Sequence, residues 1–198
     1  PVPMETIWKV LNAGVQAPAG QNTQPGKRLR GREPQHKKGG AERYARGFEA
    51  RAGLPVDPSQ RGDEVPTGML RSLYYQMDHL HEAPCLLLVC GKRDWPFKVP
   101  EAERVGLAPP NYGAVYPCVQ NILLACRALG LGAALTTMHQ IFEDELHDYF
   151  EIPHTYGVVV TIPIGYPIGR FGPVTRIPAE EKTFFDRWGQ APGADSPN

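Results

Sequence analysis

The chain has 198 residues with 21 basic and 21 acidic side chains, so its formal net charge is zero. Balanced charge gives no overall attraction for polyanions, and a hydrophobic content of 41% is enough for one large core. No apolar run approaches the roughly 20 residues of a membrane helix, and the first residues do not form a signal-peptide pattern. These totals predict one domain over residues 1–198, in the cytoplasm.

The first part of the chain predicts a helix and then a long variable segment. Residues 4–15 have helical apolar spacing, with Ile7, Trp8, Leu11 and Val15 on one side. Residues 18–25 form a loop of turn-forming and amide residues, which is either a simple polar turn or a surface for a flat heteroaromatic ring.

Residues 26–65 predict a variable excursion that is rich in basic residues, glycine and proline. Within residues 26–40 the only large apolar side chain is Leu29, so no buried strand is predicted and a solvated loop is favoured. The alternatives are an altered strand or a patch that binds phosphate or nucleic acid. No aromatic side chain interleaves the basic run, which counts against base stacking and makes a nucleic-acid partner the weaker hypothesis.

The second part predicts two strands and two short helices. Residues 85–90 form an unbroken apolar run, typical of a buried central strand, and residues 158–165 predict a second strand with Pro163 at an edge or bend. Residues 67–80 and 141–150 have helical spacing, and a Pro-broken loop over 95–110 precedes the central helix.

The metal-binding residue types are interpreted as structural. The acidic and histidine residues of 78–82 alternate on a helix and point apart, so no metal site is predicted there. The remaining histidines are interpreted as capping, surface or packing residues: His139, His147 and His154. The cysteines lie in apolar surroundings without a Cys-x-x-Cys pair, which favours buried reduced thiols over disulfides or a metal site: Cys85, Cys90, Cys118 and Cys126.

The stretch from Tyr112 to His139 predicts the central element of the fold. Its apolar spacing and few polar positions predict a long buried helix, with Pro117 in the first turn. Gly130 is placed to end this helix in the left-handed conformation, with Leu131 folding back onto it. A short strand over 133–137 should follow.

Three stretches together resemble the FMN-dependent nitroreductase family. The central run Tyr-Pro-x-Val-Gln-Asn-x-Leu-Leu-Ala-x-Arg-Ala-Leu-Gly-Leu-Gly-x-x-x-Thr-Thr resembles the family's central helix and following strand. The family's Pro-Ser-Gly-x-Asn-x-Gln-Pro-Trp loop is matched at Pro18, Gly20, Asn22, Gln24 and Pro25, with Ala19 for serine and Gly26 for tryptophan. The tail after Gly165 resembles the family's Gly-Tyr-Pro strand exit and its Arg-x-Pro-x-Glu-Glu segment.

The resemblance implies an α+β fold with a mixed β-sheet, flanking helices and a long buried central helix. It also implies a homodimer in which the C-terminal arm over 166–198 is exchanged between subunits. Aromatic residues near the end of the chain fit an arm that docks on a partner: Phe184, Phe185 and Trp188.

The resemblance further implies FMN as cofactor and NADH or NADPH as co-substrate. Hydride would pass through flavin N5 to a nitroaromatic, quinone or similar acceptor, with no catalytic side chain and no metal. The expected cofactor-binding residues are the loop residues Pro18, Ala19, Gly20, Asn22 and Gln24, the N5-facing Thr136 and Thr137, and the phosphate-binding Arg176 and Arg170. Either arginine is otherwise a surface residue of a Pro-rich tail.

The chain departs from the family at its start. Family members open with an Arg-Arg-Ser-x-Arg-x-Phe segment, whereas Pro1-Val2-Pro3 corresponds to the point just after it. Losing two or three charged hydrogen bonds, each worth about 1.5–3 kcal/mol, would weaken FMN binding strongly. Either the sequence is a fragment of a working protein, or its flavin site is weakened or lost. The alternatives to the oxidoreductase are a nitroreductase-fold binding protein without a competent flavin site and a flavin enzyme of another outcome, such as dehalogenation, dehydrogenation or flavin breakdown.

Overall fold

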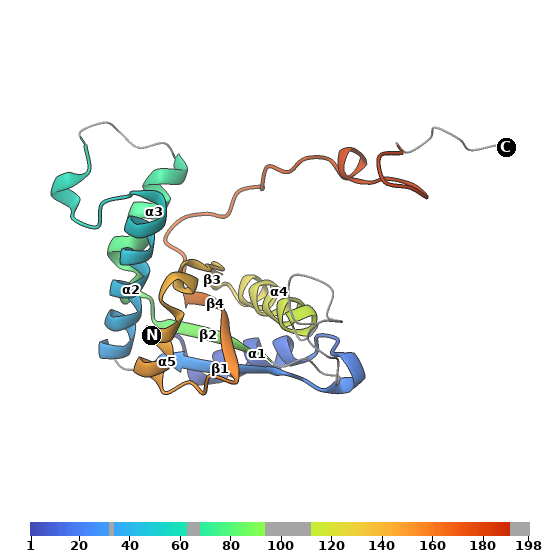
Figure 1. Cartoon of the computed structure of the whole chain (residues 1–198), viewed down its shortest axis with the longest axis horizontal. Coiled ribbons are helices and arrows are strands. Elements are labelled where there is room, and N and C mark those ends of the chain that lie inside the picture. Colours follow the sequence, from blue (N-terminus) through green and yellow to red (C-terminus); the bar gives the residue numbers. More distant parts are fainter. Residues whose placement is uncertain (32–33, 63–67, 94–111, 191–198) are drawn as a thin grey trace, which may run out of the picture. The chain divides into compact units, whose positions relative to one another are not determined.

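A four-stranded antiparallel sheet lies at the centre of the first part of the chain (Figure 1). The computed structural model describes residues 1–31, 34–62, 68–93 and 112–190. The strand order is β1-β2-β4-β3, with the bounds β1 Gly26–Gly31, β2 Cys85–Lys92, β3 Gly132–Ala133 and β4 Tyr156–Gly165. The α+β class is confirmed, but every pair among these strands is antiparallel rather than mixed. The predicted loop over 95–110 lies outside the described residues.

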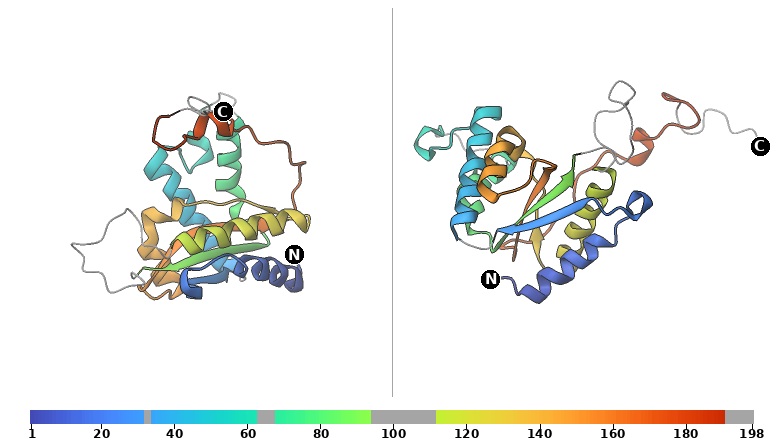
Figure 2. Two further views of the ribbon diagram at one scale, coloured as in Figure 1. Left: turned by 90° about the vertical axis from the view of Figure 1, so that its right-hand side faces the viewer. Right: turned by 60° about the horizontal axis from the view of Figure 1, so that its bottom comes forward.

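The central strand β2 is buried on both faces. Cys85, Leu87 and Val89 point into one apolar cluster, and the alternate residues, such as Leu86 and Leu88, point into another. Successive strand side chains face opposite sides, so a strand between two helical layers is apolar at every position. Figure 2 shows these layers, with α1 and α4 on one face of the sheet and α2 and α5 on the other.

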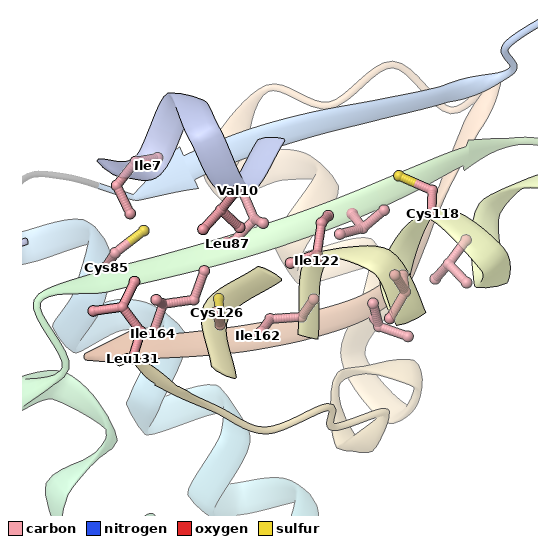
Figure 3. Packing of buried hydrophobic residues seen from close by; sticks show 14 of the residues in the cluster. Ile7, Val10, Cys85, Leu87, Cys118, Ile122, Cys126, Leu131, Ile162 and Ile164 are labelled. Atoms are coloured by element: carbon pink, nitrogen blue, oxygen red, sulfur yellow. The ribbon is translucent and has the colours of Figure 1, made fainter. Parts of the chain in front are cut away.

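The first layer packs α1 (Met4–Val15) and α4 (Tyr112–Ala128) against the sheet. Figure 3 shows Ile7 and Val10 of α1 and Ile122 of α4 directed into this cluster. The prediction for the apolar side of α1 is corrected in part. Trp8 and Val15 are 56% and 44% exposed, because the side that meets α4 carries Val10 and Gly14 instead.

The central helix ends as predicted but begins differently. Gly130 has φ of +73°, and the Leu131 N–H donates to the Cys126 carbonyl at 2.8 Å, which closes the helix end. Pro117 lies in the second turn rather than the first, because α4 already begins at Tyr112.

One side of α4 is exposed in the single chain, so the helix is not buried all round. Tyr116 and Leu124 are 42% and 58% exposed on this side, and Leu129 follows the helix end at 40%. The outer face of α4 therefore carries large apolar side chains together with the exposed Gln120 and Arg127.

The second layer contains α2 (Pro34–Ala52), α3 (Gly68–His79) and α5 (Glu143–Phe150). The prediction of a solvated loop through the basic segment is wrong: residues 26–31 form the edge strand β1, and residues 34–52 form a helix. The helix forms because four apolar residues at helical spacing are buried against α5 and the sheet: Ala41, Tyr44, Ala45 and Phe48. The alternative of an altered strand is the one that the structure shows, since β1 is a strand in which only Gly31 is fully buried.

Two predicted elements are shorter or divided. The strand expected over 133–137 consists of β3 and an isolated bridge between Thr136 and Thr161. The helix expected over 141–150 is divided into the 3-10 helix η5 (Met138–Phe142) and α5. The other 3-10 helices within the described residues are η1 (Gly20–Asn22), η2 (Pro58–Gln60), η3 (Leu80–Glu82) and η6 (Ala179–Lys182).

The state of the thiols agrees with the sequence. All four cysteines are buried and unpaired. Among the described residues no group of His, Cys, Asp or Glu side chains can hold a metal ion, and none of their helices is long and apolar enough to cross a membrane.

Residues Ile168–Asn198 form a second compact unit, separate from Pro1–Pro167. Its described part contains η6 and exposed aromatic side chains, with the rings of Phe184 and Trp188 4.9 Å apart. The exchange of this arm between subunits stays a prediction.

Candidate functional site

The amide loop after α1 has a strained backbone. Gln21, Asn22 and Gln24 have φ of +50°, +53° and +45°, in the left-handed region that non-glycine residues rarely occupy. Each such residue costs of order 1–3 kcal/mol, and strain of this kind gathers at functional sites. The Gln24 Nε2 donates to Asn22 Oδ1 at 3.0 Å, which fixes the two amides relative to each other. The loop thus presents an ordered set of exposed donors and acceptors.

A pocket lies beside this loop, at the point where three elements meet. Ala19 and Gln24 line it from the loop, and the end of α1, the start of β1 and the first turns of α4 complete its wall: Gly14, Val15, Gly26, Arg28, Ala114, Val115 and Cys118. The pocket encloses about 30 Å³, roughly the room that one water molecule needs. It is therefore a small recess, with room for no more than one small group.

The mouth of the recess matches a flat ring with polar edges. Ala and Val side chains supply an apolar wall, and the loop amides supply hydrogen-bonding groups at its margin. Of the five loop residues predicted to bind a cofactor, the structure places Ala19 and Gln24 in the lining. Pro18, Gly20 and Asn22 lie in the exposed loop beside it.

Thr136 and Thr137 do not line this recess. The backbone of Thr136 exchanges hydrogen bonds of 3.0 Å with Thr161, and its side chain is buried. Burial raises the pKa of Tyr44 to about 12, and a hydrogen bond with Thr136 opposes the rise. Thr137 lies half-buried at the start of η5. The side chain of Thr136 and both of its backbone groups thus have partners within the fold.

A buried histidine supports the same segment. The Nε2 of His139 lies 2.7 Å from the Val158 carbonyl, and its Nδ1 lies 3.4 Å from the Thr161 hydroxyl. Burial lowers the pKa of His139, so the neutral ring donates from Nε2 and accepts at Nδ1. His147 is also buried, with Nδ1 2.8 Å from the Ile152 carbonyl, and stacks on His154. His139 and His147 are thus buried packing residues and His154 is exposed, in line with the predicted capping, surface or packing roles.

The two predicted phosphate-binding arginines belong to the second unit. Arg170 and Arg176 are both exposed, and the Arg176 Nη1 donates to the neighbouring Thr175 carbonyl at 2.8 Å. Their assignment to the FMN phosphate stays a prediction.

The structure adds a residue that sequence reasoning missed. Arg28 reaches the recess from β1, although the sequence places it in a basic run without a binding pattern. Successive side chains of a strand point to opposite faces, so a strand here places Arg28 and Arg30 on one face and Lys27 on the other. This alternation is the sequence pattern that could have identified Arg28.

Comparison with known proteins agrees with this geometry. The sequence model described as "Nitroreductase family" matches residues 1–166. The chain belongs to the nitroreductase family. No sequence among the curated proteins matches it. The family is one of flavoproteins, and membership makes an oxidoreductase activity the expected class.

Solved structures share the nitroreductase fold. A BluB-like flavoprotein from Clostridium difficile 630 superposes with a TM-score of 0.68 at 20% identity, covering 94% of this chain and 91% of its own. Iodotyrosine deiodinase bound to FMN and 3-iodo-L-tyrosine gives 0.66 at 23% identity, covering 92% and 90%. A nitroreductase-like family protein from Bacillus cereus gives 0.62 at 17% identity, covering 92% and 84%. At these identities the similarity establishes the fold.

The residues around the recess fit a flavin nucleotide. The amides of Asn22 and Gln24 offer donors and acceptors suited to the edge of the ring. Arg28 carries a buried Nε without a hydrogen-bond partner, which an anionic ligand would satisfy.

Proposed function

We propose that this nitroreductase-family protein is an FMN-dependent oxidoreductase that transfers hydride from NADH or NADPH to a nitroaromatic, quinone or similar acceptor. The observation that carries the proposal is the strained amide loop, Gln21 to Gln24, at the margin of a recess with an apolar wall and one arginine. A folded chain retains such strain where a binding site requires it. FMN, when bound, would supply the hydride chemistry at its N5 atom.

The chain's own residues would position the ring and shield it. The amides of Asn22 and Gln24 would hydrogen-bond the polar edge of the flavin, while Ala19 and Val115 would contact its apolar surface. Backbone groups near Thr136 and Thr137 would face N5, and Arg170 or Arg176 would bind the phosphate. In this proposal no side chain of the protein acts as a nucleophile or a general base.

We propose that the functional unit is a homodimer. The outer face of α4 exposes Tyr116 and Leu124, and Leu129 is exposed just after the helix end. Exposed apolar surface of this kind marks interaction sites, and self-association by a two-fold axis is the commonest arrangement of soluble oligomers. A dimer would also let the Thr136 region and the C-terminal arm of one subunit serve the loop of the other.

Flavin binding is the first test. The purified protein is titrated with FMN and desalted, and its visible absorption spectrum is recorded. Retention of about one FMN per chain, followed by NADH- or NADPH-dependent reduction of a nitroaromatic or a quinone, supports the proposal. A protein that stays colourless with excess FMN contradicts it and favours a nitroreductase-fold binding protein. Flavin retention without either acceptor activity favours a flavin enzyme of another outcome.

A matched pair of loop variants locates the site. Gln24→Ala removes an amide that lines the recess, whereas Thr23→Ala changes an exposed neighbour outside the lining. A hydrogen bond of about 0.5–1.5 kcal/mol predicts a several-fold weaker FMN affinity for Gln24→Ala. Equal affinities for the two variants would place the flavin elsewhere.

A further inference from the structure

Arg28 is a charged residue on the core-facing side of an edge strand. Along β1, Lys27 is exposed and Leu29 packs in the α2 layer, so Arg28 and Arg30 face the α1–α4 layer. Arg28 lies beside the Cys118 thiol of α4 and lines the recess with Gln24. A guanidinium facing an apolar layer is unusual and calls for a partner that neutralises it.

The chain itself provides few hydrogen-bond acceptors for the Arg28 guanidinium. The Nη1 of Arg28 donates to the Gly26 carbonyl, two residues away on the same strand, at 3.0 Å. Its other contact is the Cys118 sulfur, a weak acceptor. Its Nε is buried and has no hydrogen-bond partner, and among the described residues no acidic side chain pairs with Arg28. A buried donor without a partner is destabilising, because it has lost its hydrogen bonds to water.

We propose that Arg28 binds the negative charge of the flavin nucleotide. The inference rests on the proposed function, because the flavin is the anion that the adjoining loop would hold. Two parts of FMN offer the required chemistry: the phosphate, and the pyrimidine edge of the ring, which becomes negatively charged when the flavin is reduced. Both present oxygen acceptors to which a guanidinium fork can donate two hydrogen bonds.

The neighbouring Arg30 supplies a matched control. Like Arg28 it lies on the inner face of β1 with a buried, unpartnered Nε. However, its Nη1 contacts Met4 Sδ at 2.5 Å, and it lines a different cavity, together with Lys37 and Glu82. The two arginines thus match in strand position, and only Arg28 borders the recess at the amide loop.

The experiment compares Arg28→Met, Arg28→Lys and Arg30→Met with the unmodified chain. Dissociation constants for FMN and for riboflavin, which lacks the phosphate, are measured by quenching of flavin fluorescence, and the reduction potential of the bound flavin is measured by dye equilibration. Thermal unfolding without ligand confirms that each variant is folded. Failure of the unmodified chain to bind FMN refutes the proposed function. The Arg28 variants are compared once the unmodified chain has been shown to bind FMN.

The expected result is a specific loss in Arg28→Met. If the phosphate is the partner, the FMN affinity falls at least tenfold while the riboflavin affinity is unchanged. If the ring is the partner, the reduced flavin is bound at least tenfold less tightly relative to the oxidised form, which lowers the potential by about 30 mV for two electrons. Arg28→Lys, which keeps the charge without the fork, should lie between.

Three outcomes overturn the proposal. The first is an Arg28→Met variant whose two affinities and potential stay within twofold of the unmodified chain. The second is an equal effect of Arg28→Met and Arg30→Met, which would indicate a structural role for charge on β1. The third is an equal loss of FMN and riboflavin affinity at an unchanged potential, because a contact with negative charge changes one ratio or the other. If Arg28→Met does not fold, Arg28→Gln carries the same expectations.

Discussion

The contact between α1 and α4 depends on the missing side chain of Gly14. A Cβ atom at this position would lie 2.8 Å from Cγ1 of Ile122 and 3.2 Å from Sγ of Cys118. Ile122 is fully buried and branched at Cβ, so it has little freedom to move away. We expect Gly14→Ala to destabilise the fold, because overpacking of a core costs about 1–3 kcal/mol.

A matched control, Gly113→Ala, separates the steric cost of Gly14→Ala from its gain in helix propensity. Replacing glycine by alanine in a helix contributes about 1 kcal/mol of stability, which offsets part of the steric cost. Gly113 lies in the first turn of α4, and a methyl group added there would have no neighbouring atom within 4 Å. Gly113→Ala should therefore gain the propensity term alone. The difference in unfolding free energy between the two variants isolates the steric term, about 1–3 kcal/mol.

Urea denaturation with shared m-values measures this difference. Adding Ile122→Ala removes the two nearest atoms that the new methyl group meets and leaves Cys118 Sγ, at 3.2 Å. This change alone should cost about 2–5 kcal/mol, and the double variant should be more stable than the sum of the two single effects by at least ~1 kcal/mol. Additive effects, or a Gly14→Ala variant as stable as Gly113→Ala, would refute the reasoning.

Two further predictions concern a buried carboxylate and the apolar face of α4. Glu143 accepts from the Val158 N–H at 2.6 Å and pairs with Arg93 at 2.8 Å. Burial raises its pKa, but these partners lower it below 4.5 overall, so its contribution is present above pH 4.5 and is lost as the pH falls. Glu143→Gln should be less stable than the parent by about 1–3 kcal/mol at pH 7. Between pH 7 and pH 4 the variant should lose less stability than the parent, as measured by thermal unfolding. Leu124→Asp should shift the protein from dimer to monomer in sedimentation analysis.

Each of these has its control. Glu5 forms an exposed pair with Lys9 at 2.8 Å, so Glu5→Gln should leave stability nearly unchanged. Met69, 79% exposed on α3, is the control for the apolar face, and Met69→Asp should leave the oligomeric state unchanged. A Glu143→Gln variant with the parent's pH profile, or a Leu124→Asp variant that remains dimeric, would contradict the corresponding prediction.

Elements with a strong local pattern could be predicted from the sequence. Elements that are buried in the fold but rich in polar residues could not. The apolar run of β2 and the helix stop at Gly130 were found because each needs a few neighbouring residues to be diagnosed. The helix α2 was missed because its basic and glycine residues outweigh four apolar ones in composition. Its pattern was present nonetheless, since Ala41, Tyr44 and Phe48 recur at helical spacing.

The loop residues of the candidate site could be predicted from the sequence, but Arg28 could not. The loop residues, including Gln24, came from the family resemblance, and the strained backbone gives that assignment a physical basis. Arg28 was not predictable, because its role depends on which face of an unpredicted strand it occupies. The exposure of Trp8 likewise depends on which helix α1 meets, and that contact joins positions far apart in the sequence.

The wall of the recess also determines when the site can exist during synthesis. It combines Ala19 and Gln24 with Val115 and Cys118, residues about a hundred positions apart, and contacts of such long range form late in folding. A growing chain emerges at about 5–20 residues per second, so the loop is outside the ribosome for several seconds before α4 arrives. A cofactor at this recess would therefore bind a nearly finished polypeptide, and it would favour completion of the fold rather than its nucleation.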